Sequence, residues 1–575
     1  MSIQKRFAEM RHGAGACANL CLPVHQFVLI HSHQQRNLHF PYKPLQITLS
    51  MPPLHSTTAS EMVRVVGAPK LICAALPPQS LDHLLNGMHQ AKIQGADVVQ
   101  IELDSLSHSD LTILLRNKPI PVLLLSRPKW EGDECKSNEQ DHLQSLLLAK
   151  DLGADYIDLE LKVASALIKE DKFHQLKSSK IIVSTYLDSF TALLEDPSLL
   201  VAEMKSTGAD IIKFVWEAAN ITEISTAFDL LSNSQVPMIA HCTGERGLIS
   251  QLLSFKFGGV FAYGSVEGNT IPGLPSVNIL RQAYGVKNTN MGTEVFGLIS
   301  KPVSHSKGPL LHNPTFRHAG YNGIYVPMFV DNLKEFFSVY TSPDFAGYSV
   351  GIPYKEAVID FCDEVHPVAQ SIGAVNTIVR RRDDGKLVGY NTDCEAAIVA
   401  IEDALKRRDG LNGKNGPLSP ITGKQFVLVG AGGAGRALAF GAKIRGAKVV
   451  VFDIDFGRAK SLAAAVSADA LPFDDLLTFR PEKDAILANA TPLGMNPHVE
   501  RRIPVLEETL RDYKLVFDAV YNPRKTRLLK EAEAAGAVIV SGVEMFLGQA
   551  AAQFSLFTGQ KAPEEFMREI VMEKF

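Results

Sequence analysis

The residues with the clearest chemical meaning form a glycine-rich turn between two apolar runs. The stretch Val427–Gly435 reads Val-Leu-Val-Gly-Ala-Gly-Gly-Ala-Gly, and Asp453 closes the next apolar run. This pattern predicts a strand, a tight turn and a helix whose first amides can bind a pyrophosphate. A carboxylate at position 453 can accept both hydroxyls of a ribose and repels a 2′-phosphate. The pattern therefore predicts a dehydrogenase that uses NAD rather than NADP, whereas the alternative for a motif this short is a plain glycine turn.

The residues of the turn have separate expected roles. Gly430 allows the tight bend, Gly432 lets the backbone approach the pyrophosphate, and Gly435 lets helix and strand pack closely. Gly433 and Ala434 complete the loop. We expect all five residues to line the cofactor.

Length and composition bound the class of protein. A chain of 575 residues and 62.8 kDa exceeds a single hydrophobic core, so several domains are expected. A hydrophobic content of 46% with a net charge of −4 argues against nucleic acid or a membrane surface as partner. No apolar run is long enough to span a bilayer. The seven cysteines are scattered, and Cys17 and Cys21 lack a second pair at ligand spacing, so neither a disulfide framework nor a metal site is predicted.

The N-terminal segment, residues 1–65, differs from everything after it. Glu9 is its only acidic residue before Glu61, and Pro, Ser and Thr are frequent. This composition is typical of organelle transit peptides. Two interpretations stay open, a plastid address or a disordered tail on a cytoplasmic protein.

Short apolar runs separated by helical segments follow in residues 66–285. Their rhythm is that of βα units, and their number predicts a (β/α)8 barrel, with an open doubly wound sheet as the alternative. The runs are Leu71–Leu76, Asp97–Leu103, Pro121–Arg127, Tyr156–Leu161, Lys180–Thr185, Ile211–Trp216, Pro237–Cys242 and Val260–Ser265.

Lys213 lies inside the sixth of these runs. A lysine within an apolar strand is costly to bury without a role, and desolvation would depress its pKa and let the amine attack a carbonyl to form a Schiff base. The alternative is an outward side chain whose amine reaches solvent. Other candidates at the carboxyl ends of the strands, where barrels place their chemistry, are Glu102, Arg127, Glu131, Tyr186, His241, Cys242 and Ser265.

A second α/β system begins near Thr293. The sequence predicts a small α/β substrate domain over 293–400, then a Gly/Pro-rich linker and a Rossmann dinucleotide domain over 422–543. It also predicts C-terminal helices over 544–575 that pack back on the substrate domain. The remaining strand-like runs are Glu294–Ser300, Gly323–Val330, Gly347–Ile352, Val375–Arg380, Ala447–Phe452, Ala485–Ala490, Leu515–Asp518 and Ala537–Ser541.

Seven strings spread over this whole region carry a family resemblance. They are Arg127–Gly132, Gly244–Gly247, Lys301–Lys307, Ile372–Thr377, Gly389–Asp393, Asn489–Met495 and Ser541–Met545. In type and order they resemble the plant bifunctional 3-dehydroquinate dehydratase/shikimate dehydrogenase family. The resemblance covers about Leu71 to the C-terminus and implies a type I dehydratase barrel fused to a two-domain dehydrogenase.

The resemblance also implies site residues in the dehydrogenase half. Lys355 and Asp393 match its proton-transfer pair, in which a lysine held by a carboxylate bonds the reacting oxygen and relays its proton while hydride moves to nicotinamide. The implied substrate contacts are Ser304, Ser306, Gly308, Gly351, Asn376, Tyr521 and Gln549, and the further cofactor contacts are Asn489, Thr491, Met495 and Gly542.

The barrel departs from the family pattern. The Schiff-base lysine survives as Lys213, but Tyr186 stands where the family has its acid/base histidine. The Glu-x-Arg pair of the second strand reads Gln-Ile-Glu and ends at Glu102, while Gln251 and Leu274 replace an arginine and a glutamine. Because a carboxylate repels the carboxylate that an arginine would bind, these changes indicate a dehydratase in decay. The alternatives are a compensated active variant and a barrel that serves as a non-catalytic scaffold or metabolite sensor.

The dehydrogenase half departs at three places. Gly308 and Gly351 stand where the family has Ser and Thr, which removes two hydroxyls beside the substrate carboxylate. The NADP-binding Asn-Arg-Thr triplet reads Asp453-Ile-Asp455. A pocket with more room and fewer hydrogen-bond donors predicts that the substrate is quinate, whose tetrahedral C1 carries a hydroxyl, rather than shikimate. The alternative is drift that leaves a slow shikimate enzyme.

Together these residues predict an NAD-dependent quinate dehydrogenase that interconverts quinate and 3-dehydroquinate, with an impaired dehydratase. The alternative is a bifunctional enzyme that dehydrates 3-dehydroquinate and reduces the product to shikimate. The sequence leaves the oligomeric state open.

Overall fold

The computed structural model describes residues 69–126, 130–131, 134–135, 139–176, 178–187, 197–267, 274–304, 306–410, 418–496 and 499–574. The chain divides into units 1–62 and 63–575, and the account below concerns the second. The expectations for the N-terminal segment 1–65, for Arg127 and for the side chain of Glu131 lie outside the described residues. In the part that is described, no helix is long and apolar enough to cross a membrane.

The eight apolar runs form one parallel sheet. Its order is β10-β1-β2-β3-β6-β7-β8-β9, so the last strand lies beside the first. At the seam between β9 and β10 the amide of Val260 donates to the carbonyl of Met238 at 3.1 Å, and the ring is nearly closed. The barrel prediction is confirmed. The strands are β1 (Leu71–Ala75), β2 (Val98–Glu102), β3 (Val122–Ser126), β6 (Tyr156–Glu160), β7 (Lys180–Leu187), β8 (Ile211–Glu217), β9 (Met238–Thr243) and β10 (Phe261–Ser265).

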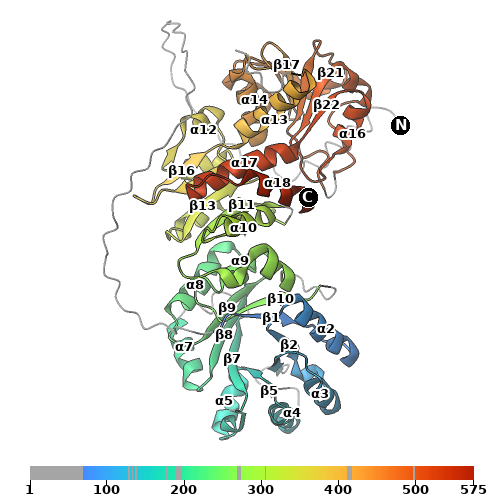
Figure 1. Cartoon of the computed structure of the whole chain (residues 1–575). Helices are drawn as coiled ribbons and strands as arrows, with labels where there is room; N and C mark the ends of the chain where they lie inside the picture. The colour runs from blue at the N-terminus through green and yellow to red at the C-terminus, as the bar shows by residue number, and fades with distance from the viewer. Residues whose placement is uncertain are drawn as a thin grey trace. The chain divides into compact units, whose positions relative to one another are not determined.

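Helices between the strands cover the outside of the barrel (Figure 1). In α2 the side chains of Leu84, Met88 and Ala91 share one helical face and are buried, and Gly95 ends the helix in the left-handed conformation. The helices are α2 (Leu81–Gln94), α3 (His108–Arg116), α4 (Glu139–Asp151), α5 (Leu161–Lys169), α7 (Pro197–Ser206), α8 (Ile224–Asn233) and α9 (Gly244–Leu253), and β4 (Trp130–Glu131) and β5 (Glu134–Cys135) pair as a small hairpin.

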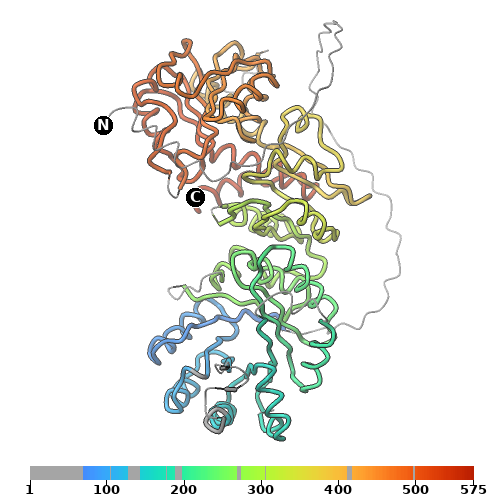
Figure 2. The backbone as a smooth tube through the Cα atoms, turned by 180° about the vertical axis from the view of Figure 1, so that it is seen from behind, coloured from blue at the N-terminus to red at the C-terminus, as the bar shows by residue number. Residues whose placement is uncertain are grey.

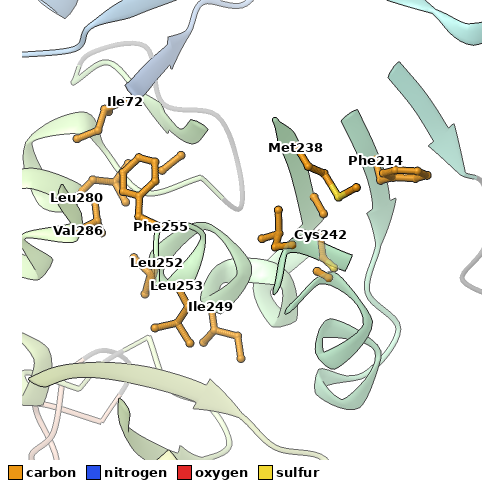
Figure 3. Close-up of a cluster of buried hydrophobic side chains, with 14 of the residues drawn as sticks. Ile72, Phe214, Met238, Cys242, Ile249, Leu252, Leu253, Phe255, Leu280 and Val286 are labelled. Atoms are coloured by element: carbon orange, nitrogen blue, oxygen red, sulfur yellow. The ribbon is translucent and has the colours of Figure 1, made fainter. Parts of the chain in front are cut away.

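The barrel core continues into the segment that leads to the second half. Figure 3 shows Ile249, Leu252 and Leu253 of α9 gathered with Leu280 and Val286, all of them buried. Burial of each such side chain stabilises the fold by about 1.5–3 kcal/mol. The barrel and the link therefore share one hydrophobic core.

The substrate domain has a mixed sheet of order β12-β11-β13-β15-β16-β14. Strand β11 pairs in parallel with β12 and β13, and β15 runs antiparallel between β13 and β16. Two of its strands, β14 and β16, have no counterpart among the predicted runs. The elements are β11 (Glu294–Ser300), β12 (Gly323–Phe329), β13 (Phe345–Val350), β14 (Glu364–Val365), β15 (Thr377–Arg380), β16 (Leu387–Tyr390), α10 (Gly308–His318), α11 (Leu333–Val339) and α12 (Pro367–Ile372).

The dinucleotide domain is a parallel sheet of order β19-β18-β17-β20-β21-β22. The strand order reverses between β17 and β20, and ligands of such sheets bind outside this switch point. Strand β19 is the one that the sequence did not predict. The elements are β17 (Gln425–Val429), β18 (Lys448–Asp453), β19 (Asp469–Pro472), β20 (Ala485–Asn489), β21 (Tyr513–Asp518), β22 (Val538–Ser541), α14 (Gly433–Ile444), α15 (Phe456–Ala465) and α16 (Arg527–Ala534).

Three helices join the two dehydrogenase domains. Helix α13 (Asp393–Arg408) continues past the predicted boundary at residue 400, because it packs against both α14 and α17 (Gly542–Thr558). Helices α17 and α18 (Glu564–Lys574) place apolar side chains against α10 and β11, where the rings of Phe296 and Phe557 stack with centroids 4.6 Å apart. Figure 2 shows this red C-terminal run returning to the green elements of the substrate domain.

Ion pairs and hydrogen bonds connect the barrel to the substrate domain. Arg246 of α9 donates two hydrogen bonds to Asp331, at 2.6 Å from Nε and 3.0 Å from the terminal nitrogen. Asp331 also accepts from Lys301 at 2.9 Å. The hydroxyl of Tyr340 donates to the carbonyl of Ile221 at 2.6 Å. The barrel thus contacts the start of the loop that carries Ser304 and Ser306.

Candidate functional site

An ion pair between Lys355 and Asp393 lies where the two dehydrogenase domains meet. The Nζ atom of Lys355 lies 2.5 Å from Oδ2 of Asp393, and the two side chains are 19% and 5% exposed. Lys355 follows β13, and its carbonyl accepts a hydrogen bond from Val375 at 2.7 Å. The lysine is therefore held by a carboxylate and keeps contact with solvent, as a group that exchanges protons with a substrate needs.

Local structure places Asp393 at the first turn of α13. The carboxamide oxygen of Asn391 accepts from the amides of Asp393 and Cys394, both at 3.1 Å. The partial positive charge of a helix N-terminus stabilises a carboxylate. Helix α13 thus supplies both the position and a favourable field for the acid of the pair.

The glycine turn reaches this pair from the other domain. Gly430 has φ 107°, a left-handed conformation that favours glycine, and Gly432 is the N-cap of α14. A Cβ atom at Gly433 would lie 2.8 Å from Cβ of Lys355, and one at Gly435 would lie 1.9 Å from the carbonyl oxygen of Gly430. Both glycines are therefore required by close approach of neighbouring groups.

The same turn fits a dinucleotide. A Cβ atom at Gly432 would have the terminal nitrogen of Arg458 at 3.8 Å as its nearest neighbour, so the backbone is accessible there. The half-buried Ala434 stands in the first turn of α14, whose free amides can bind a pyrophosphate. The turn thus has room for phosphate oxygens beside the Lys355 side of the cleft.

The two carboxylates of the second dinucleotide strand differ in role. Oδ2 of Asp453 accepts from the amide of Ala431 at 2.6 Å, and Oδ1 accepts from the amide of Asp455 at 2.8 Å. Asp453 therefore holds the glycine turn and keeps lone pairs for a ribose. Asp455 caps α15 by accepting from the amides of Gly457 and Arg458. Asp455 therefore serves the helix, and Asp453 is the carboxylate that we expect at the ribose.

Glu356 forms ion pairs between the two dehydrogenase domains that the sequence did not reveal. Its carboxylate accepts from Arg436 of α14 at 3.1 Å and from Arg458 of α15 at 2.7 Å. These pairs join α14 and α15 to the residue that follows Lys355. The only available signal was its adjacency to Lys355, since both arginines lie far away in sequence.

The substrate loop and the two glycines lie together. Ser304 is exposed, and the hydroxyl of Ser306 accepts from the amide of Gly308 at 3.2 Å. A Cβ atom at Gly308 would lie 3.0 Å from the ring of Tyr325, and one at Gly351 would lie 2.8 Å from the hydroxyl of Ser300. Both glycines therefore face other side chains, which corrects the expectation that they simply leave empty space.

The other expected substrate contacts are anchored. The buried Asn376 donates to Thr392 at 2.9 Å and accepts from its amide at 2.8 Å. Burial raises the pKa of Tyr521 to about 12, and its ring packs at a tilt of 33° against Phe546, with centroids 4.6 Å apart. Gln549 donates to the carbonyl of Phe546 at 3.0 Å.

The expected cofactor contacts after β20 play two parts. Asn489 is fully buried and donates to Asp518 at 2.9 Å, so it positions the loop and differs from the expected direct contact. Its Oδ1 accepts from the hydroxyl of Thr491 at 2.7 Å. Met495 is half-buried in this loop, and Gly542 begins α17, where a Cβ atom would lie 2.4 Å from the carbonyl oxygen of Ala519.

A cavity of about 320 Å³ lies on one side of the substrate loop. The Lys355–Asp393 pair and the two glycines do not line it. Its lining residues are Ile279, Tyr284, Ser304, Ser306, Lys307, Pro309, Leu310, Asn496 and Asn522.

Lys213 points into the barrel. Its Nζ atom lies 2.8 Å from Oδ2 of Asp158, and the two side chains are 2% and 0% exposed. The amine also donates to Gln100 at 3.4 Å and lies 4.9 Å from the ring centroid of Tyr263 and 5.5 Å from that of Tyr186. The interpretation that Lys213 snorkels to solvent is therefore excluded.

The charge state of Lys213 differs from the expectation. Burial, the largest single cause, lowers its pKa, but the Asp158 carboxylate together with Tyr186 and Tyr263 more than offsets this, and the pKa lies well above its ordinary value. The prediction of a depressed pKa is wrong because the sequence did not reveal Asp158 as a partner. Burial and the Lys213 ammonium lower the pKa of His241 to about 3, so His241 stays neutral.

Several polar atoms in the barrel have no hydrogen-bond partner among the described residues. They include Oδ1 of Asp158, Nδ1 of His241, the hydroxyl of Tyr263 and Nε2 of Gln251. Buried polar groups without a partner are costly, so water or a small polar molecule fits this interior. Of the other strand-end candidates, Glu102 is half-buried, and Cys242 and Ser265 are buried. In the part that is described, no cluster of His, Cys, Asp or Glu could hold a metal ion.

The fold and the two sites together define an α/β enzyme in which a barrel precedes a two-domain oxidoreductase. Residues 72–291 match the type I 3-dehydroquinase family, residues 298–378 the shikimate dehydrogenase substrate binding domain and residues 542–572 the shikimate 5′-dehydrogenase C-terminal domain. The chain is 46% identical over 513 residues to the chloroplastic bifunctional 3-dehydroquinate dehydratase/shikimate dehydrogenase of Arabidopsis thaliana, over 88% of this chain and 85% of that protein. The chain therefore belongs to the bifunctional 3-dehydroquinate dehydratase/shikimate dehydrogenase family, and its second half is an oxidoreductase of the shikimate dehydrogenase type.

Other relatives match the second half alone. The shikimate dehydrogenase (NADP(+)) of Methanopyrus kandleri is 39% identical over 291 residues, which cover 49% of this chain and 96% of that protein. A solved quinate dehydrogenase from Corynebacterium glutamicum in complex with NAD is 28% identical, with a TM-score of 0.43, and the match covers 49% of this chain and 99% of that one.

We predict that Lys355→Met lowers kcat by about 10²–10⁴-fold, because the reacting oxygen loses its proton carrier. The measurement is steady-state oxidation of the preferred acid, with the melting temperature recorded in parallel. Lys561→Met, at an exposed lysine, is the control and should leave both quantities unchanged. A kcat within a few-fold of the parent protein would show that Lys355 does not carry the proton.

Proposed function

We propose that the dehydrogenase half interconverts quinate and 3-dehydroquinate with NAD. The observation that carries this proposal is the set of residues at the two ends of the cleft. Gly308 and Gly351 offer no hydroxyl to the substrate, and Asp453 stands at the ribose end with Ile454 beside it. A nicotinamide dinucleotide agrees with the cofactors named for the Methanopyrus and Corynebacterium relatives.

The Lys355–Asp393 pair supplies the proton chemistry. In the oxidation, the substrate hydroxyl loses its proton through Lys355 while its carbon loses a hydride. NAD, when bound, is the hydride acceptor. Asp393 holds the amine in place by an ion pair at 2.5 Å.

The two glycines bear on the choice of acid. A hydrogen bond to a charged group is worth about 1.5–3 kcal/mol, so the loss of two hydroxyl donors weakens binding of the shikimate carboxylate by orders of magnitude. Quinate carries a hydroxyl of its own at the tetrahedral C1 carbon and can satisfy polar groups that shikimate leaves unpaired. The preference therefore moves toward quinate.

Charge at the ribose end bears on the choice of cofactor. Asp453 keeps lone pairs for the ribose hydroxyls, and the exposed Ile454 offers no cation to a 2′-phosphate. Arg458 is the nearest cation to Gly432, and it is already paired at 2.7 Å with Glu356, a carboxylate that it shares with Arg436. A 2′-phosphate would thus meet repulsion without a free cation.

A second candidate function is the bifunctional one that gives the family its name. It is favoured by the 46% identity to the Arabidopsis protein and by Lys213, which lies at the centre of the barrel. In this case the barrel dehydrates 3-dehydroquinate and the second half reduces the product to shikimate. We favour an impaired barrel, because Tyr186 replaces the acid/base histidine and Asp158 keeps Lys213 charged.

The N-terminal segment, residues 1–65, bears on location. Its acid-poor composition and the chloroplastic name of the Arabidopsis relative support a plastid address. A cytoplasmic location remains the alternative. A fluorescent fusion of residues 1–65 separates the two.

The proposed function is tested by kinetics with both acids and both cofactors. We expect kcat/KM for quinate with NAD to exceed that for shikimate with NADP by at least about tenfold, which corresponds to about 1.4 kcal/mol. The same four assays on the Methanopyrus protein are the comparison. A higher kcat/KM for shikimate with NADP would overturn the proposal and favour the second candidate.

Cofactor choice should respond to the triplet at the ribose end. Asp453→Asn with Ile454→Arg and Asp455→Thr removes a carboxylate and adds a cation, while threonine can still cap α15. We expect kcat/KM with NADP to rise and that with NAD to fall, each by about tenfold or more, with little change in kcat. Asp455→Thr alone is the matched control and should change neither. An undiminished NAD preference in the triple variant would show that Asp453 does not contact the ribose.

The barrel is tested by borohydride trapping. Incubation with 3-dehydroquinate and borohydride should leave Lys213 unmodified by mass spectrometry, because an ammonium held at 2.8 Å from Asp158 is not a nucleophile. The Arabidopsis protein is the positive control. Irreversible modification at Lys213 with measurable dehydration would restore the bifunctional interpretation.

A further inference from the structure

Ser300 and Gly351 stand side by side at the ends of neighbouring strands. Strands β11 and β13 pair in parallel with Ile299 opposite Val350, so the next residues of each strand are Ser300 and Gly351. The amide of Gly351 donates to the carbonyl of Ile299 at 2.8 Å. The two positions are thus fixed by the sheet itself.

The side chain of Ser300 stands where a side chain at position 351 would go. A Cβ atom at Gly351 would lie 2.8 Å from Oγ and 3.0 Å from Cβ of Ser300. The first distance is too short for a Cβ atom unless Ser300 shifts, and the second is tighter than most Cβ contacts in proteins. Ser300 is 3% exposed, so it has little freedom to move away.

The hydroxyl of Ser300 is already engaged. Its Oγ atom lies 3.0 Å from the carbonyl oxygen of Pro302 and 2.9 Å from that of Ile352. Pro302 begins the substrate loop and Ile352 begins the turn that carries Lys355. A hydroxyl has one proton, and both neighbours are acceptors, so Ser300 has no proton left for a substrate carboxylate.

We propose that Ser300 is a specificity-determining residue that acts with Gly351 as one unit. Its side chain fills the space that a side chain at position 351 would need, but it donates no hydrogen bond to the substrate carboxylate. Its hydroxyl also joins the substrate loop to the turn that carries Lys355. This inference rests on the proposed preference for quinate. A side chain with a hydrogen-bond donor fits at position 351 only when the side chain at position 300 is made smaller.

The test is a double-mutant cycle with Ser300→Gly, Gly351→Thr and both together. Gly351→Thr alone should lower the melting temperature and reduce kcat/KM for both acids by about tenfold or more, because its Cβ overlaps Ser300. The double variant should melt above Gly351→Thr, and its shikimate-to-quinate ratio of kcat/KM should rise about tenfold over the parent protein. Gly308→Ser is the comparison, because its Cβ meets the outer edge of Tyr325 at 3.0 Å and needs no change at Ser300.

Two measurements keep this inference separate from the proposed function. Melting temperatures report the overlap whichever acid is the substrate, so additive effects of the two substitutions would overturn the inference. A parent-like Gly351→Thr variant would also overturn it. If the parent protein prefers shikimate with NADP, the proposed function fails, while a non-additive melting temperature would still show that the two residues form one unit.

Discussion

The ion pair between Lys355 and Asp393 is the constraint on which the dehydrogenase half depends. Asp393 is held at the start of α13, and the carbonyl of Lys355 is held by the amide of Val375, so the 2.5 Å contact joins two separately anchored segments. Gly433 then fits against Lys355 because it lacks a Cβ atom. Glu356 fastens the dinucleotide domain beside the pair through Arg436 and a second arginine. The cleft can therefore bring a substrate oxygen, a proton carrier and a dinucleotide together.

The barrel contains the same chemical pair in a different setting. Lys213 and Asp158 lie 2.8 Å apart with almost no exposure, whereas Lys355 keeps contact with solvent. A buried charge needs its partner, so Asp158 stabilises the ammonium and opposes the neutral amine that carbonyl attack requires. The barrel also contacts the dehydrogenase through Arg246 and Asp331. This ion pair joins the two halves of the chain.

The two glycines beside the substrate loop show why a missing side chain is not the same as a void. At Gly308 the ring of Tyr325 stands where a Cβ atom would point, and at Gly351 the hydroxyl of Ser300 does so. Interiors are close-packed, so a neighbour takes up the volume that a deleted side chain leaves. The neighbour does not supply the missing hydrogen bond to the substrate, because the hydroxyl of Ser300 is engaged by two backbone carbonyls.

The sequence alone determined the barrel strands, the central dinucleotide strands and the glycine turn, because hydrophobic runs and glycine spacing are local signals. It missed β4, β5, β14, β16 and β19, which have two to four residues and show no periodicity. Only the tertiary structure decided the partners of the charged side chains. Asp158, Glu356 and Ser300 carry no local signal, since each acts on residues that are distant in sequence or on a neighbouring strand. The chemistry of a charged side chain depends on the groups that folding places beside it. Asp158 holds Lys213 in an interior with almost no exposure, whereas Asp393 holds Lys355 where solvent still reaches it. The two lysines look alike in the sequence, and only their surroundings distinguish them.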